Sequence, residues 1–140
     1  MKFLERLHPL ALLGLRVVLG IVLIAHGYGK VFGGMAKFIA MVQNLGLPGW
    51  MAYLAAATEF AGGILIIAGL LTRLAALSFC VEMAVAIDKV HWKNGLKGPA
   101  GVEFPLAVAI IAFALIFLGA GPISLDGVFF RGGGGSPARK

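Results

Sequence analysis

Residues 15–30, LRVVLGIVLIAHGYGK, form an apolar segment that as a helix is long enough to cross most of a bilayer, yet it carries Arg16, His26 and Lys30. A charged side chain at the bilayer centre costs at least ~2.5–3.5 kcal/mol, so such residues normally face a protein interior or a water-filled cavity. We therefore expect this helix to have neighbours that supply polar partners. Because Arg16 interrupts the apolar run, we interpret the segment as a first membrane span and not as a signal peptide.

The rest of the chain has the composition of an integral membrane protein. Of its 140 residues, 60% are hydrophobic and 13% are charged, whereas soluble proteins contain about 25% charged residues. The apolar residues fall into four blocks of membrane-spanning length. We predict an all-α fold, with the domain over residues 1–127 and a flexible Gly-rich tail at 128–140. The domain is an antiparallel bundle of four transmembrane helices at about residues 9–28, 50–70, 74–92 and 102–119.

The basic charge of the chain does not indicate nucleic-acid binding. The net charge is +6, but the twelve Lys and Arg residues are scattered over predicted helix ends and loops, without a basic stripe. We expect the lipid bilayer as their partner and exclude nucleic acid. The single cysteine, Cys80, can form no internal disulfide and is expected to pack as a small apolar residue.

Two features of the first half of the chain bear on how the spans pack. Apolar residues recur at helical spacing between the first two spans, at Phe38, Met41, Val42 and Leu45, and predict a short interfacial amphipathic helix. We favour a plain connector there, and the alternative is a lid over a site. Small residues would let helices approach closely: Gly14, Gly20, Gly27, Ala55, Gly62, Gly63 and Gly69.

The connections also predict a topology. The turn at residues 71–73 is so short that the second and third spans must be antiparallel neighbours. Four spans place both termini on one side of the membrane. Six basic residues on that side against five on the other favour cytoplasmic termini.

Ionisable side chains from all four predicted spans gather in the same half of the bundle: His26, Lys30, Glu59, Asp88, His91 and Glu103. His26 and Lys30 are four residues apart and share a helix face. Glu59 lies about 14 Å into its span at 1.5 Å per residue. We therefore predict a polar pocket between the helices, below the membrane surface.

Most of these residues also have a structural interpretation. A histidine such as His26 can simply hydrogen-bond a backbone carbonyl at a helix interface. Asp88 and the lysines near the headgroups can be explained by snorkelling, and Glu103 by the dipole of the helix that it opens. Histidines on different helices could also ligate a metal or haem, but no HxxxH or ExxH pattern is present, and we disfavour that interpretation.

Glu59 and Glu82 are harder to explain, because each is predicted to lie deep in its span and must be protonated, paired or hydrated. Arg16 is expected to reach toward one of them and form a buried ion pair, which on the structural interpretation only fixes the helix register. On the functional interpretation, the carboxyl group at the floor of the pocket handles protons, since burial favours its neutral form. Both interpretations stay open at this point.

Several of these residues together resemble the DoxX-like membrane proteins. The first-helix pattern R-x-x-L-G…H-G-x-x-K is matched by Arg16, Leu19, Gly20, His26, Gly27 and Lys30. Further residues resemble the later segments of the family: Glu59, Gly62, Gly63, Gly69, the Leu-Thr-Arg turn at 71–73, His91, Glu103, Phe104 and Ser124-Leu125-Asp126. The resemblance implies a four-helix protein of the bacterial cytoplasmic (inner) membrane. It also implies a link to quinone-dependent redox systems, with Arg16, His26, Lys30, Glu59, His91 and Glu103 as carried-over residues.

We therefore expect an oxidoreductase subunit in which a quinone headgroup enters the polar pocket. The expected catalytic residues are Glu59, which exchanges protons, and His26 and His91, which hydrogen-bond a quinone carbonyl. The expected substrate-binding residues are Arg16, Lys30, Glu103, Glu82 and Asp88, of which Glu82 and Asp88 rest on burial and position alone. Protein partners of a redox complex, or further copies of the chain, would complete the assembly. The alternative is a non-catalytic assembly subunit or a carrier for a small hydrophobic or acidic solute.

Overall fold

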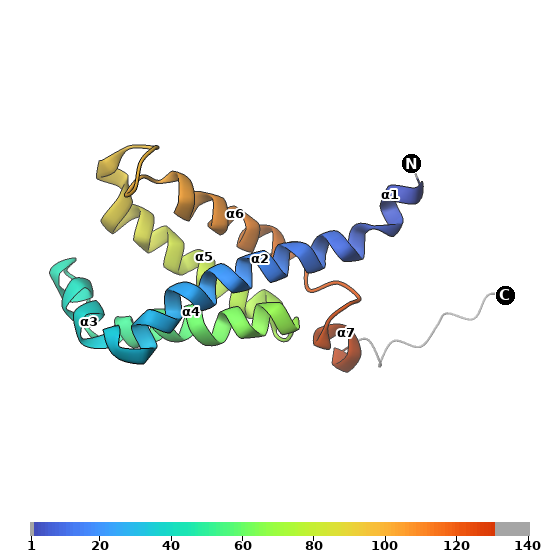
Figure 1. Cartoon of the computed structure of the whole chain (residues 1–140), viewed down its shortest axis with the longest axis horizontal. Coiled ribbons are helices and arrows are strands. Elements are labelled where there is room, and N and C mark those ends of the chain that lie inside the picture. Colours follow the sequence, from blue (N-terminus) through green and yellow to red (C-terminus); the bar gives the residue numbers. More distant parts are fainter. Residues whose placement is uncertain (1, 131–140) are drawn as a thin grey trace.

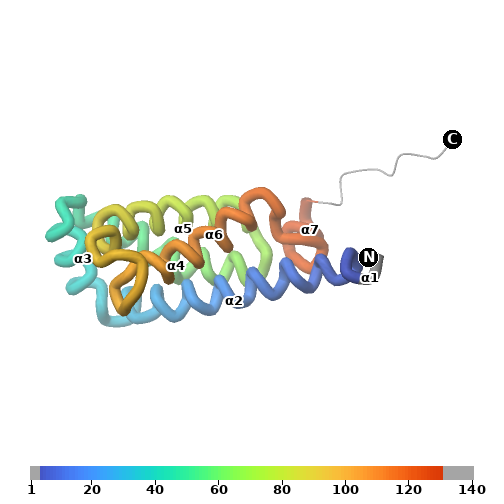
Figure 2. The backbone as a smooth tube through the Cα atoms, turned by 90° about the horizontal axis from the view of Figure 1, so that it is seen from above, coloured from blue at the N-terminus to red at the C-terminus, as the bar shows by residue number. Residues whose placement is uncertain are grey.

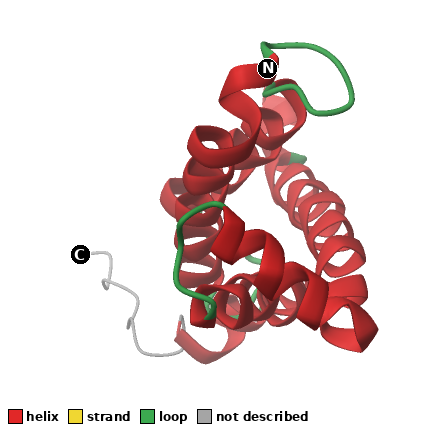
Figure 3. Cartoon of the chain, turned by 90° about the vertical axis from the view of Figure 1, so that its left-hand side faces the viewer, coloured by secondary structure: helices red, strands yellow, loops and turns green. Residues whose placement is uncertain are grey.

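The long axis of the molecule follows four helices that alternate in direction (Figure 1, Figure 2). They are α2 (His8–Gly29), α4 (Trp50–Ala68), α5 (Thr72–Ala86) and α6 (Glu103–Leu118). The computed structural model describes residues 2–130, and in that part of the chain every regular element is helical (Figure 3). The predicted all-helical fold is therefore confirmed.

Shorter elements lie at the two ends of the bundle: α1 (Lys2–Arg6), a kinked turn (Lys30–Gly34), α3 (Met35–Asn44), a π-helical turn (Ile87–His91), a 3-10 turn (Trp92–Asn94) and α7 (Leu125–Phe130). Helix α3 lies at one end, and α1 and α7 lie at the other (Figure 1, Figure 2). We call these the α3 end and the α7 end. Each chemical feature described below belongs to one end.

The predicted helix positions agree with the structure to within a few residues, and α3 occupies the connector predicted to be amphipathic. Two helical segments, His8–Asn44 and Trp50–Ala68, are long and apolar enough to cross a membrane, and the apolar α6 is shorter, with 16 residues. The predicted tail at 128–140 lies mostly outside the described residues. Its first three positions differ from the prediction, because α7 continues through Phe130.

Local sequence explains where the helices stop. Helix α4 ends at Gly69, which adopts φ +69°, and the N–H of Leu70 reaches back to the carbonyl of Leu65 at 2.9 Å. This left-handed residue followed by a backward hydrogen bond is a Schellman cap, which glycine favours. Helix α2 is separated from α3 by a kink in which Gly33 has φ +116°. The kink turns α3 across the α3 end.

Helices α2 and α4 pack backbone to backbone through glycines. A Cβ atom at Gly63 would lie 2.9 Å from the carbonyl oxygen of Gly20, and one at Gly27 would lie 2.5 Å from the backbone nitrogen of Phe60. Gly14 and Gly62, by contrast, have no atom within 4 Å of such a Cβ. Beside this contact the core is apolar and buried: Leu12, Leu19, Leu23, Ile66, Ala76, Phe79, Ala112 and Leu115.

Candidate functional site

Three ionisable side chains from three elements meet inside the half of the bundle nearer the α3 end. The Lys30 ammonium, from the turn after α2, lies 2.7 Å from Oε1 and 2.6 Å from Oε2 of Glu59 on α4. The Glu82 carboxyl group, on α5, lies near enough to Glu59 and Lys30 to interact with their charges. We call Lys30, Glu59 and Glu82 the carboxyl cluster.

The side chains of the carboxyl cluster are largely buried. The Glu59 side chain is 5% exposed and that of Lys30 is 25% exposed. Helix α3 contributes part of this cover, since the Lys30 ammonium lies 4.2 Å from the centre of the Phe38 ring. A cation over an aromatic face is attracted by the ring quadrupole. Phe38 therefore ties α3 to the cluster, a contact that the amphipathic pattern of α3 did not reveal.

The charges of the carboxyl cluster do not balance when both acids are ionised. Two carboxylates face one ammonium, and like charges at this separation disfavour simultaneous ionisation. Oε2 of Glu82 is buried and accepts no hydrogen bond within the described part of the chain. The cluster becomes neutral when it holds one proton between Glu59 and Glu82, so this arrangement can store a proton and release it.

A small cavity connects the carboxyl cluster with His26. It measures about 30 Å³ and lies between α2, α4, α5 and α6, with Glu59 and His26 both in its wall. A volume of this size holds one or two water molecules. It is far smaller than the roughly 300–1,000 Å³ of small-molecule sites, so it does not fit a quinone headgroup.

His26 stands at the outer edge of this cavity. Its Nδ1 lies 2.8 Å from the carbonyl oxygen of Val22, and its ring stacks on Phe104 of α6 with centroids 5.6 Å apart. Because a carbonyl can only accept, this contact assigns the proton to Nδ1 and leaves Nε2 free to bind another proton. Both rings are exposed, so His26 links the cavity to the outside of the bundle.

Arg16 lies elsewhere, and the expected ion pair with Glu59 or Glu82 is wrong. Its side chain is 1% exposed and donates hydrogen bonds to four backbone carbonyls at the α7 end: Ile66 (2.9 Å), Ile67 (2.6 Å), Ala120 (2.8 Å) and Ile123 (2.6 Å). The last turn of α4 and the segment after α6 thus satisfy the guanidinium. Lys30, and not Arg16, is the cation of the carboxyl cluster.

Three other predicted residues lie at the α3 end but outside the cluster. His91 contacts the carbonyl of Ala100 through Nδ1 at 2.8 Å, and Glu103 accepts a hydrogen bond from the N–H of Gly98 at 3.4 Å. Both organise the loop before α6. Asp88 is exposed and lies 3.3 Å from Lys89. Asp88 and His91 lie in the π-helical turn at Ile87–His91, and Glu103 is the first residue of α6.

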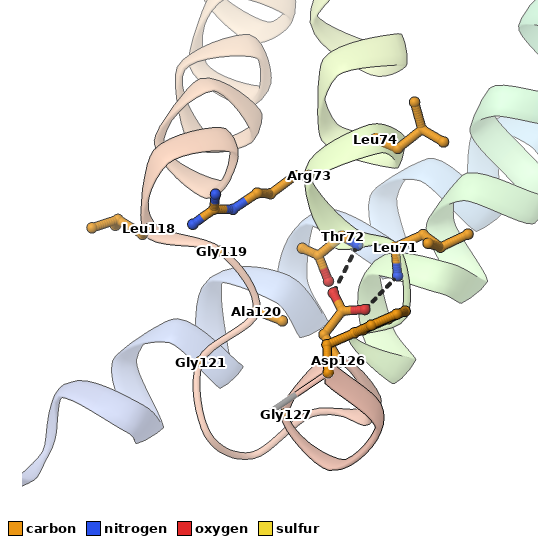
Figure 4. Close-up of a pocket in the computed structure, with 11 residues that line it drawn as sticks. Leu71, Thr72, Arg73, Leu74, Leu118, Gly119, Ala120, Gly121, Asp126 and Gly127 are labelled. Atoms are coloured by element: carbon orange, nitrogen blue, oxygen red, sulfur yellow. Dashed lines mark hydrogen bonds between the residues drawn. The ribbon is translucent and has the colours of Figure 1, made fainter. Parts of the chain in front are cut away.

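Asp126 has a structural role at the α7 end that the sequence pattern did not predict. Its carboxylate accepts hydrogen bonds from the N–H groups of Leu71 (2.8 Å), the N-cap residue of α5, and of Thr72 (3.0 Å), the first residue of that helix (Figure 4). An acidic residue at a helix N-terminus satisfies free donors and complements the helix dipole. The usual signal for such a cap is local, whereas Asp126 comes from a distant part of the chain.

The chain is similar to proteins of one family over most of its length. A family model described as DoxX matches residues 11–92. A Bacillus subtilis protein named "Putative oxidoreductase CatD" is 37% identical over 84% of this chain and 86% of its own length. The Escherichia coli "Inner membrane protein YqjF" is 35% identical over 87% and 94%. An uncharacterized Haemophilus influenzae protein is 35% identical over 94% and 99%. No solved structure matches the chain.

Proposed function

The chain belongs to the DoxX family of membrane proteins, and we propose that it is the proton-handling membrane subunit of a quinone-linked redox complex. One observation carries the proposal: the carboxyl cluster places two acids and a single cation inside an apolar bundle. Intramembrane ionisable groups are costly and typically mark proton or substrate pathways. The redox assignment is supported by the name of the Bacillus subtilis relative.

We further propose how the chain sits in the membrane. In this arrangement four segments span the inner membrane as one domain: α2, α4, α6, and α5 together with the turns that follow it. The structure describes residues 2–130 of this domain. The α7 end faces the cytoplasm, because the count of basic residues favours that side. The family membership and the name of the Escherichia coli relative support the inner-membrane assignment.

The proposed proton path runs from Glu59 through the small cavity to His26. Glu59 and His26 line the same 30 Å³ space, and one or two water molecules there would connect the carboxyl group to the imidazole. His26 passes the proton at Nε2, since Nδ1 is held by Val22. Lys30 forms an ion pair with Glu59 at the inner end of this path.

The quinone belongs outside this cavity, because the cavity is too small for its headgroup. We place the contact at the lipid-facing edge, where the exposed His26 and Phe104 offer an aromatic surface and a free imidazole nitrogen. Quinone reduction consumes two electrons and two protons. Partner proteins supply the electrons in this proposal, and the chain supplies protons.

The proposal is tested with Glu59→Gln and Glu82→Gln in cells whose own copy of the chain is replaced by the variant. Each change removes a proton carrier and keeps the side-chain shape. We expect electron transfer to quinone in isolated membranes to fall by about a hundredfold, the usual contribution of a positioned acid or base. Glu5→Gln, an exposed carboxyl on α1, is the matched control and should be normal.

Protein level decides between the two interpretations of Glu59. If Glu59→Gln disappears from the membrane, the ion pair with Lys30 is structural, and the assembly or carrier role is favoured. Normal electron transfer at a normal protein level would refute the proton-handling role. Organic extraction of the purified protein, with mass analysis for quinones, then tests the quinone contact separately.

A further inference from the structure

A second, larger cleft lies at the α7 end, opposite the carboxyl cluster. It encloses about 400 Å³ between the start of α5, the segment that follows α6, and α7 (Figure 4). This volume lies within the range of small-molecule sites. We call it the Arg73 cleft, after the cation in its wall, and none of the proton chemistry proposed above uses it.

The Arg73 guanidinium has N–H donors that are not used in hydrogen bonds among the described residues. In the described part of the chain its guanidinium makes a single long hydrogen bond, 3.4 Å to the carbonyl of Phe117. Figure 4 shows its side chain extended toward Gly119, away from Asp126. A guanidinium carries five N–H donors in a planar fork that matches the oxygens of a phosphate. Arg73 is therefore positioned to bind an anion.

The other polar groups of the cleft are consistent with a negatively charged ligand. The Asp126 carboxylate is already engaged by two backbone N–H groups and lies near the charge of Arg16. Thr72 is 0% exposed, and its hydroxyl has no hydrogen-bond partner among residues 2–130. An unpaired buried hydroxyl is costly. Because it is fully buried, a ligand in the cleft does not reach it, and Arg73 is the exposed charged side chain of the cleft wall.

The rim of the cleft is apolar, which distinguishes a lipid from a free anion. Leu74, Leu118 and Phe130 are all exposed around it. In the membrane orientation proposed above, this end lies at the cytoplasmic surface, where anionic headgroups are concentrated. A phospholipid would place its phosphate at Arg73 and its acyl chains along these apolar side chains.

We propose that the Arg73 cleft binds the headgroup of an anionic phospholipid, with Arg73 holding the phosphate oxygens. The proposal rests on the spanning arrangement proposed above but not on the proton path. The Glu59→Gln variant should therefore bind the lipid like the wild type, and the two proposals fail separately.

The test is lipid binding by the full chain, purified in detergent and titrated with phosphatidylglycerol or phosphatidylcholine under native mass spectrometry. We expect the wild type to retain one phosphatidylglycerol in preference to phosphatidylcholine. Arg73→Gln should weaken that binding about tenfold or more, as expected for a hydrogen bond to a charged group. Arg6→Gln removes an exposed cation of the same end and should stay within about twofold.

Other results would overturn the proposal. Equal binding of the two lipids, or equal loss in Arg6→Gln and Arg73→Gln, would indicate diffuse attraction to a basic surface. Displacement of the lipid by millimolar inorganic phosphate would identify a site for a free anion. Arg73→Lys keeps the charge without the fork and should bind with intermediate strength. Its thermal unfolding, compared with that of the wild type, verifies that the fold is intact.

Discussion

Arg16 makes four hydrogen bonds from one buried side chain, and they join three segments that are far apart in the sequence. A buried guanidinium needs such partners, because leaving its donors unpaired costs the full desolvation penalty. Backbone carbonyls in the last turn of α4 and in the segment after α6 supply them. At the scale of single residues, Arg16 therefore stabilises the α7 end, while Lys30 and its partners form the polar centre nearer the α3 end.

Replacing Arg16 with Met should lower the free energy of unfolding by roughly 3 kcal/mol or more, since several carbonyls lose a charged donor at once. Arg16→Lys should fall between, because an ammonium cannot match the planar fork. Denaturant unfolding in detergent micelles measures both. Arg6→Met is the matched control on an exposed position. An unchanged midpoint for Arg16→Met would mean that these hydrogen bonds contribute nothing net.

The sequence predicted correctly that certain buried polar side chains require partners. It did not predict which groups those partners are. The sequence indicated that Arg16 and Glu59 each require a partner. It did not show that carbonyl oxygens would satisfy Arg16, because backbone acceptors leave no mark on the sequence. Lys30 was predicted in the same half of the bundle as Glu59, yet their direct contact depends on the exact rotation of α2 against α4.

At the scale of helices, the close contact between α2 and α4 depends on particular glycines. Small residues in both helices predicted a close approach. Which of them face the partner depends on the helix rotation: Gly20 and Gly63 do, whereas Gly14 and Gly62 face open space. Adjacent glycines of one helix therefore carry opposite consequences for stability.

Gly63→Ala and Gly62→Ala form a matched pair on α4. A Cβ at Gly63 would meet the Gly20 carbonyl at 2.9 Å and Leu23 Cβ at 3.0 Å, so overpacking should cost about 1–3 kcal/mol. A Cβ at Gly62 has room, and Ala there should stabilise the helix by roughly 0.5–1 kcal/mol. Unfolding of both variants in detergent gives the comparison. Equal effects would contradict the tight α2–α4 contact.

At the scale of the whole molecule, the polar groups divide between the two ends of an apolar bundle. The carboxyl cluster lies toward the α3 end, where helix α3 covers it. Arg16, Asp126 and the Arg73 cleft lie at the α7 end. The helix positions were predictable because apolar blocks and Gly/Pro boundaries are local signals. Asp88, His91 and Glu103 do not share the predicted pocket, because Asp88 is exposed and the other two hydrogen-bond the loop before α6.

The four-span arrangement is tested by cysteine labelling in a Cys80→Ala background. Single cysteines replace exposed residues at the two ends: Glu5 near α1, Lys37 on α3 and Lys97 in the loop before α6. A membrane-impermeant thiol reagent applied to intact cells with a permeable outer membrane should label positions 37 and 97. Position 5 should react only after the inner membrane is opened. Labelling of all three positions from one side would contradict the topology.

The hydrogen bonds of Arg16 also have a consequence for biogenesis. Ile67 follows Arg16 by 51 residues and Ile123 follows it by 107. At about 5–20 residues per second, synthesis takes roughly 5–20 s to deliver the last partner. Throughout this interval the newly made first helix carries an unsatisfied guanidinium, and only completion of the chain relieves it. A nascent chain that stops before residue 120 has the Ile66 and Ile67 carbonyls but lacks both acceptors of Nη1, those of Ala120 and Ile123.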